Sequence, residues 1–519
     1  IDLSTEGPFA KGKRASYLVN YRYSTLGLLS AMGVDIGDEV ITFQDLAFNI
    51  ATPLGKRGTL SVFGMAGVSS NNFDALTDTA EWEYDKDDRT IDYAARMGAV
   101  GMSLTLSVGP RAHWRTSAAW SEGTQERMES ITNTSGNFAT IDKISLRQRK
   151  LSLLSVLRGQ LVGSRSAFGF TVGINAMGRT IDRIGFNFVQ ENFGVLLRPF
   201  AELQYAIGER LTVTGGAAYA HFSFNNAHAV EPRASLKWRD NRSNEISFSM
   251  GSRAELPQQQ LYVTGTDQLP VNRNIGFVSC NDAVLAYSRP IGPSATMLRA
   301  EVFYQVLRDI AVVDTRLVDD AGIGAFAMSN AWDEANYNSL LDGGTAQNAG
   351  VELSLNRRVM NNWFYQVNAT VFDAMYAGAD GVEREARWNN QYISNVVLGR
   401  EWAKQKETLK RTWGFSGRAN VAGGQRTTPI DEGASRATRG TVYDMTKAYT
   451  EQLGSVFRMD LRVYLKREHR NRTGMWALDL LNATNAQNEA FRYFDLRKDE
   501  VVTKYQLGLI PNLSYRIEF

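Results

Sequence analysis

The strongest constraint in this sequence is a strict two-residue alternation at its C-terminal end. From 505 to 519 every odd position carries an apolar or aromatic side chain, and most even positions carry a polar one. A β-strand points successive side chains to opposite faces, so this segment has one apolar and one polar face. It ends on the aromatic Phe519, and Pro511 within it marks a bulge or a break in strand pairing.

The same alternation recurs along the chain, and it predicts further strands at 13–24, 229–238, 296–309 and 456–466. These strands run for about 10–16 residues, whereas strands of soluble proteins usually have about 5–6 and a membrane strand needs about 9–11. Their polar faces carry many Arg, Glu and Asp, which fits a wide aqueous lumen. We therefore predict an all-β fold, a transmembrane antiparallel β-barrel.

The orientation of this barrel follows from the two faces of its strands. The apolar side chains should meet lipid, and the charged side chains should meet water. Phe457, Leu461, Ile517 and Phe519 are then expected on the outside of the wall. A soluble β-protein would instead pack these four side chains into a shared interior.

Length and composition agree with one large membrane domain. The 519 residues contain no Pro/Ser-rich linker, and no apolar run approaches the roughly 18 residues of a membrane helix. The 57 basic and 55 acidic side chains nearly cancel, which excludes the basic excess of a nucleic-acid-binding protein. A single cysteine, Cys280, excludes an intramolecular disulfide and a cysteine-based zinc site.

The connections between the predicted strands are of two kinds. Short polar turns are predicted at 54–58, 109–112, 207–210, 239–244, 291–295 and 467–473. Long segments are predicted near 70–92, 257–277, 313–345, 424–455 and 485–501. This asymmetry is typical of an outer-membrane barrel, which has short periplasmic turns and long extracellular loops.

The strand count predicts that the barrel is not complete in this sequence. We count 21 strands, beginning with a short one at 1–9, and the last must descend to the periplasm. Single-chain bacterial barrels have an even number of strands, so we expect 22, with one ascending strand before Ile1. Residues 1–519 are then one barrel domain, from strand 2 to strand 22. A lumen of 22 strands needs a plug, and the plug is also expected upstream of Ile1.

At this point the residues resemble a known family. The stretches RMDLRVYLKRE (458–468), WALDLLNATNAQNE (476–489) and YQLGLIPNLSYRIEF (505–519) resemble the end of TonB-dependent receptors of the Bacteroidetes type. Further similar segments, in the same order, are 7–24, 61–73, 229–238, 297–310, 348–357 and 422–431. Relatives of this type often carry a carboxypeptidase-like regulatory domain and a plug before the barrel.

The resemblance implies a location, a function and partners. The location is the bacterial outer membrane, where lipid and lipopolysaccharide surround the barrel. The function is TonB-dependent active import of a nutrient such as a siderophore, glycan or peptide. TonB would act through a plug that this sequence does not contain, and surface lipoproteins or other outer-membrane subunits are further partners. Two alternatives stay open: a receptor or scaffold subunit without transport, and a passive channel.

Candidate site residues follow from the same segments. The charged residues expected to hold the plug in the lumen are Glu231, Arg233, Arg426, Asp431, Asp460 and Arg462. The alternative is that these side chains contact only water and keep the lumen wall hydrated. Trp332 and Tyr337, in a loop rich in amides, are expected to contact substrate.

Catalysis and cofactors have no support in the sequence. There is no G-x-S-x-G, no HExxH and no phosphate-binding glycine loop. The acidic loop 70–92 lacks the spacing of a calcium-binding loop and is interpreted as solvated. We therefore predict no enzyme activity, no cofactor and no metal site.

Overall fold

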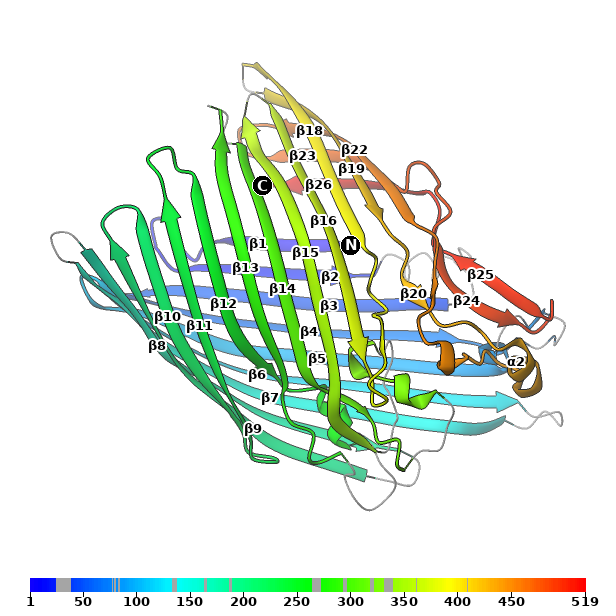
Figure 1. Ribbon diagram of the computed structural model, residues 1–519. Coiled ribbons are helices and arrows are strands. Elements are labelled where there is room, and N and C mark those ends of the chain that lie inside the picture. Colours follow the sequence, from blue (N-terminus) through cyan, green and yellow to red (C-terminus); the bar gives the residue numbers. More distant parts are fainter. Residues whose placement is uncertain are drawn as a thin grey trace.

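The structure is a computed structural model, and it forms a single curved wall of antiparallel strands (Figure 1). It describes residues 1–24, 39–76, 78, 81–82, 85–132, 138–162, 166–185, 189–263, 272–292, 296–317, 322–330, 339–360, 362–407 and 409–519. Among these residues no helix is long and apolar enough to cross a membrane.

The wall is built from long strands that follow one another in the sequence. They are β1 (Asp2–Pro8), β2 (Ser16–Tyr23), β3 (Glu39–Leu54), β4 (Gly58–Phe73), β5 (Arg89–Gly109), β6 (Ala112–Thr132), β7 (Phe138–Val162), β8 (Ser166–Ile184), β9 (Val189–Ile207), β10 (Leu211–Phe222), β11 (Ala227–Arg239), β12 (Glu245–Glu255), β13 (Val278–Ile291), β14 (Thr296–Val313), β15 (Leu340–Met360), β16 (Trp363–Ala377), β17 (Glu383–Glu385), β18 (Tyr392–Lys406), β19 (Leu409–Ala422), β22 (Val456–Glu468), β23 (Thr473–Leu481) and β26 (Ile510–Glu518).

The remaining elements lie in the connections between strands. They are the paired strands β20 (Arg426–Thr427) and β21 (Glu451–Gln452), the hairpin β24 (Glu489–Asp495) and β25 (Glu500–Tyr505), helix α2 (Glu432–Thr438), and the 3-10 turns η2 (Asp85–Asp88), η3 (Gln259–Val263), η4 (Ile323–Ala325), η5 (Met328–Asn330) and η6 (Met445–Lys447).

Each strand of the wall pairs with its neighbour in sequence, so the topology is a simple meander. The sheet of the described residues has 22 strands. One of them, β17, has three residues and pairs with the end of β16 beside the start of β18. Without β17, 21 strands run along the wall, which is the number predicted from the alternation. Within the described residues the sheet is not closed, because β1 pairs only with β2 and β26 only with β23.

The two rims of the wall differ as the sequence predicted. At the rim that we call the turn end, β3 and β4 are joined by residues 55–57, and β5 and β6 by residues 110–111. At the opposite rim, the loop end, residues 423–455 join β19 to β22, and residues 482–509 join β23 to β26. Both edge strands, β1 and β26, run from the loop end to the turn end.

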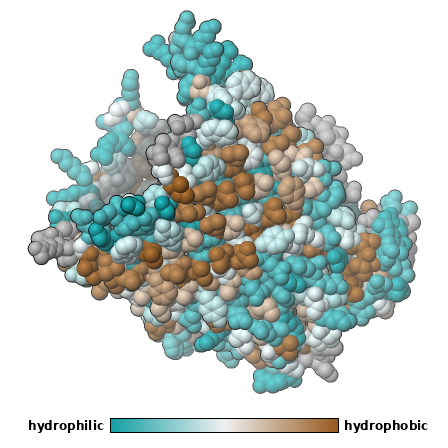
Figure 2. Space-filling model, turned by 45° about the horizontal axis from the view of Figure 1, so that its top comes forward, coloured by the Kyte–Doolittle hydropathy of each residue, from teal (hydrophilic) through white to brown (hydrophobic). Residues whose placement is uncertain are grey.

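The outward face of the wall carries an apolar band. On β7 the outward positions from Leu151 to Leu161 are four leucines, a serine and a glycine, and Leu151 and Leu161 are 60% and 65% exposed. This span has the length of about 9–11 residues that crosses a membrane. Directly beyond it toward the loop end, Arg149 and Arg147 form ion pairs with Asp182 and Glu122. The charges mark where the band ends, and Figure 2 shows apolar side chains gathered in patches bordered by hydrophilic ones.

The four residues expected on the outside of the wall lie on its outward face. Phe457 and Ile517 are 40% and 41% exposed, and Phe519 is 94% exposed. Leu461 is partly exposed on the same face as Phe457. These four side chains therefore share no interior, and the polar residues of β22 lie on the other face.

One predicted strand is shorter than expected. The alternation predicted a continuous strand from 505 to 519, but β25 ends at Tyr505 and β26 begins at Ile510. The intervening backbone is held by loop contacts: the amide of Leu509 donates to Asn485 Oδ1 over 3.0 Å, and Gln506 N donates to Asn488 O over 2.8 Å. Local hydrogen bonds that Asn485 and Asn488 accept thus replace the ladder that periodicity alone suggested.

The main buried core of the described residues lies at the loop end, on the inward face. Phe222 of β10 and Leu196 of β9 point inward and pack against Leu261 and Tyr262 of η3. Tyr262 is fully buried, and its hydroxyl donates to the carbonyl of Ile275 over 3.1 Å. The η3 part of the connection between β12 and β13 therefore folds inward and covers the inward face of β8–β10 at the loop end, where the lumen opens.

The assignment of the two faces leads to a first prediction. Replacing outward Leu153 with Arg places a charge in the apolar band, and we expect it to lower the free energy of unfolding in phospholipid vesicles by about 2–4 kcal/mol. Replacing its inward neighbour Ser152 with Arg is the matched control, and we expect a far smaller change because this side chain meets water. Equal losses from the two variants in denaturant titrations would contradict the face assignment.

Candidate functional site

The inward face of β9–β13 carries a hollow lined by charged side chains. Its volume is about 550 Å³. The lining side chains that bear charge are Arg198, Glu202, Glu231, Arg233, Arg253, Glu255 and Asp282. They gather here because alternate residues of neighbouring antiparallel strands face the same side, so the inward positions of β9, β11, β12 and β13 bring these charged side chains into one row.

Part of this row is held rigidly by its own contacts. Glu231, only 6% exposed, accepts a hydrogen bond from the amide of Ala254 over 2.8 Å and pairs with Arg198 at 3.3 Å. Arg198 also donates to the carbonyl of Ala254 over 2.6 Å. Glu231 and Arg198 therefore clamp both polar groups of one residue at the end of β12, where the connection toward η3 begins.

Arg233 differs from Glu231 in having no such fixed partner. It is exposed on the inward face of β11, and it forms no ion pair among the residues that the structure describes. Arg253 across the hollow pairs with Asp282 at 3.3 Å. The guanidinium of Arg233 is thus available to a group that enters the lumen, whereas Glu231 serves the wall itself.

Two further predicted residues, Asp460 and Arg462, lie on the inward face of β22, well away from this hollow along the sheet. Asp460 accepts hydrogen bonds from Arg458 at 2.8 Å and from the amide of Asn482 at 2.9 Å. Arg462 pairs with Asp479 of β23 at 3.2 Å. Both residues are on the lumen wall as expected, and among the described residues they contact the wall strands β22 and β23 and the loop that follows β23.

The other predicted residues lie elsewhere. Arg426 and Asp431 belong to the long connection between β19 and β22, at the loop end rather than on a wall strand. Arg426 pairs with Glu385 of β17 at 3.2 Å, and Asp431 caps helix α2 by accepting from the amide of Ala434 over 2.9 Å. Trp332 and Tyr337 lie outside the described residues.

The mouth around Arg426 is a network of charged and amide groups. Asn389, fully buried, donates to Asp373 over 2.7 Å, and the amide of Arg387 donates to Asn330 Oδ1 over 3.0 Å. In the neighbouring loop, hydrogen bonds from Arg384 to Asp380 at 2.6 and 2.9 Å lower the pKa of the Asp380 carboxyl. These contacts fix the loops over this part of the rim.

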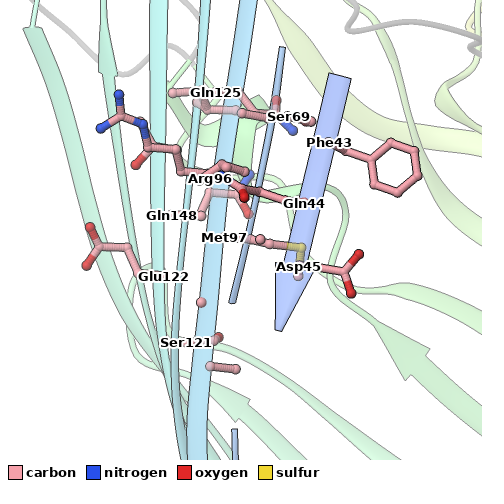
Figure 3. Close-up of a pocket in the computed structure, with 18 of the residues that line it drawn as sticks. Phe43, Gln44, Asp45, Ser69, Arg96, Met97, Ser121, Glu122, Gln125 and Gln148 are labelled. Atoms are coloured by element: carbon pink, nitrogen blue, oxygen red, sulfur yellow. The ribbon is translucent and has the colours of Figure 1, made fainter. Parts of the chain in front are cut away.

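A second hollow on the lumen wall, of about 420 Å³, was not predicted. It lies along β3–β7 and is lined on the inward side by Phe43, Met97, Gln125 and Gln148. Figure 3 shows Phe43 pointing away from the side that Arg96 occupies. Apolar Phe43 and Met97, 41% and 58% exposed, stand on the face that is otherwise polar. Their position on the polar phase of the alternation was the signal available in the sequence.

The described residues suggest no centre for metal chemistry. Among them, no group of three or more His, Cys, Asp or Glu side chains is placed to hold a metal ion. Cys280 is a free thiol on the inward face of β13, half-buried between its neighbours. What the arrangement offers is a charged passage with amide and aromatic groups at its mouth, suited to binding and transit.

Comparison with known proteins places this architecture in a family. Residues 35–486 match the family described as TonB dependent receptor-like, beta-barrel. Among curated proteins no match was found.

Solved structures with the same fold cover nearly the whole chain. The outer membrane transporter YddB from Escherichia coli aligns with a TM-score of 0.70 and 12% identity, over 99% of this chain and 74% of its own. BauA, the ferric preacinetobactin receptor from Acinetobacter baumannii, aligns at 0.66 and 11%, over 99% and 77%. FyuA, the ferric yersiniabactin uptake receptor from Yersinia pestis, aligns at 0.64 and 12%, over 100% and 77%. At these identities the likeness shows the fold.

The Glu231 clamp leads to a second prediction. In Glu231→Ala the amide of Ala254 loses its acceptor and Arg198 loses its counter-charge, and we expect about 1–3 kcal/mol less stability at this site. Hydrogen exchange at 254–263 should accelerate by about 5- to 150-fold, because 1.4 kcal/mol corresponds to a factor of ten. Glu202→Ala, in the same hollow, is the control. Unchanged exchange in Glu231→Ala would show that the clamp does not hold this connection.

Proposed function

The chain belongs to the TonB-dependent receptor-like β-barrel family, and we propose that it forms the wall of an energised importer that carries a nutrient across the bacterial outer membrane. Family and fold are those of outer-membrane transporters and receptors, not of enzymes. The observation that carries the proposal is the charged inward face of a wall of 21 strands, with Arg233 in its hollow and without an ion pair among the described residues.

The free edges of the wall support a further strand in the complete barrel. A strand edge cannot face lipid, because each unsatisfied backbone group there costs several kcal/mol. Strands β1 and β26 run in the same direction, so one antiparallel strand between them satisfies both edges. We propose that this strand ascends from the turn end to the loop end, which makes 22 strands, an even number.

A wall of this size needs an occupant of its lumen if it is to be selective. Barrels of 16–18 strands already leave an aqueous channel, and 22-stranded transporters have a plugged lumen. We propose that a plug domain sits against the inward face and that TonB acts on it, with the turn end toward the periplasm and the loop end outside. Arg233 then pairs with an acceptor of the plug, and Asp460 and Arg462 border it.

The substrate enters from the loop end in this proposal. Two of the structures with the same fold are, by name, receptors for ferric preacinetobactin and ferric yersiniabactin. The resemblance to Bacteroidetes receptors favours a bulky nutrient that a surface lipoprotein delivers. The loop network around Arg387, Asn389 and Arg426 provides rigid amide and guanidinium groups at the mouth. These groups suit a polar, hydrogen-bonding nutrient.

The proposal is tested by the energy dependence of uptake. Cells that produce the protein should accumulate the nutrient only when TonB and a proton gradient are present, and deletion of TonB should abolish accumulation. Uptake that persists without TonB would identify a passive channel. Normal assembly of a surface complex with no uptake of any nutrient would identify a scaffold.

The closing strand is tested by hydrogen exchange. In an open sheet the amides of β26 that do not bond to β23 exchange freely, whereas a strand on the other side protects them. We expect residues 510–518 of the protein in bilayers to be protected as well as 473–481 of β23. Fast exchange of alternate amides in 510–518 beside slow exchange in 473–481 would exclude the closing strand.

The plug contact is tested at Arg233. We expect Arg233→Ala to weaken retention of the plug while the barrel still inserts, and so to increase leakage of small solutes through the outer membrane. Lys237→Ala is the matched control, because Lys237 lies on the same face of β11 and already pairs with Glu245 at 3.2 Å. Leakage equal to that of the unaltered protein would count against the role of Arg233.

A further inference from the structure

The outward face near the turn end carries a row of large side chains across five neighbouring strands. Trp402, Trp413, Leu465, Trp476 and Tyr515 are successive partners in the ladder from β18 to β26. The three tryptophans and the tyrosine are each 44–53% exposed. Tryptophan and tyrosine gather where hydrocarbon meets headgroups, so this row marks the membrane boundary at the turn end.

A row of cations lies one step beyond the aromatic row, two residues nearer to the turns. Lys404 of β18 is directly opposite Arg411 of β19, and Arg411 is directly opposite Arg467 of β22. All three side chains are exposed on the outward face. Like charges directly opposite each other on a sheet destabilise it, because their Cβ atoms are only about 5 Å apart.

On the inward face of the same strands, cations have a carboxylate partner. There the ammonium groups of Lys410 and Lys466 each pair with Glu468, at 3.0 and 2.9 Å. In the part of the chain that the structure describes, no carboxylate pairs with Lys404, Arg411 or Arg467. The chain therefore neutralises its inward cations itself and leaves the outward row to another partner.

A fourth cation lies one step from the aromatic row, on the side of the apolar band. The guanidinium of Arg400 lies 4.8 Å from the ring of Trp363 and 5.0 Å from the ring of Trp402. Its Nε is buried and has no hydrogen-bond acceptor among the described residues. Stacking between two indoles holds this charge beside the membrane boundary, on the side of the row where the apolar band begins.

We propose that this surface binds an anionic phospholipid of the periplasmic leaflet, with its phosphate among Lys404, Arg411 and Arg467 and its acyl chains along the apolar band. A phosphate accepts strong hydrogen bonds from guanidinium and ammonium groups and removes the repulsion within the row. The aromatic row sets the depth. The proposal is independent of the imported nutrient and requires only the membrane location and the orientation of the wall.

The experiment uses the full-length protein and lipids of defined composition. The test variant combines Lys404→Gln, Arg411→Gln and Arg467→Gln, and the control combines Lys56→Gln, Arg57→Gln and Arg111→Gln, which removes three exposed charges from turns on other strands of the same end. Each protein is exchanged into nanodiscs that contain phosphatidylglycerol and phosphatidylcholine. The lipid that remains bound after extraction is counted by native mass spectrometry.

The expected outcome is a preference for phosphatidylglycerol that depends on the row. One Lys or Arg near an anionic surface contributes about 1 kcal/mol to binding. The ratio of retained phosphatidylglycerol to retained phosphatidylcholine should therefore fall by about tenfold or more in the test variant. The control should keep it. The single variant Arg411→Gln should lose part of it and covers the case in which the triple variant does not fold.

Four results would overturn the proposal. The first is equal retention of both lipids by the unaltered protein. The second is a preference that the test variant retains, and the third is one that the control loses to the same extent. A preference for lipopolysaccharide over phosphatidylglycerol at this end, measured by the same method with added lipopolysaccharide, would also reject a phospholipid site.

Discussion

The backbone hydrogen bond in a medium without water is the constraint on which this structure depends. Lipid offers no partner to an exposed amide or carbonyl, so the chain must pair every strand with another strand. A meander of antiparallel strands does this with short connections at one rim and leaves the other rim free for long loops. The two edges, β1 and β26, are where the described sheet leaves this requirement unmet.

The two-residue period then decides the role of each charged side chain. Arg233 and Arg400 are chemically the same, but one lies on the inward face of β11 and the other among tryptophans on the outward face of β18. A third arginine, Arg426, lies above the wall and ties the β19–β22 connection to Glu385. Face and height in the membrane, rather than residue type, separate the proposed contacts with a plug and with lipid from the support of a loop.

Much of the wall could be predicted from the sequence, because one face of each strand meets lipid and the other meets water, and this difference produces the alternation of apolar and polar residues. Strands at 13–24, 229–238, 296–309 and 456–466 were found within a few residues of their ends. The loops could not be predicted in this way. Helix α2 and the hairpin β24–β25 depend on local contacts such as the Asp431 cap, which leave no periodic signal.

The candidate site was predicted in part for the same reason. Glu231, Arg233, Asp460 and Arg462 occupy the polar phase of strands, so their place on the lumen wall followed from parity. Arg426 and Asp431 were predicted to line the lumen because segment 422–431 resembles the family. That segment has no two-residue period, and both residues lie in a folded loop at the loop end. The hollow along β3–β7 was missed because Phe43 and Met97 are apolar residues in the polar phase, which weakens the pattern used to find strands.

The mouth of the wall is built in two different ways, and this difference bears on where a ligand is recognised. Strands β5–β7 have 21–25 residues, far more than a membrane requires, and continue beyond it as a ladder of paired strands. Strands β22, β23 and β26 have 9–13 residues and rely on folded connections instead. A ladder of paired strands presents only the repeating pattern of a sheet. Folded connections bring buried amides and guanidinium groups from distant segments to one place, so specificity for a nutrient is best carried on that side of the rim.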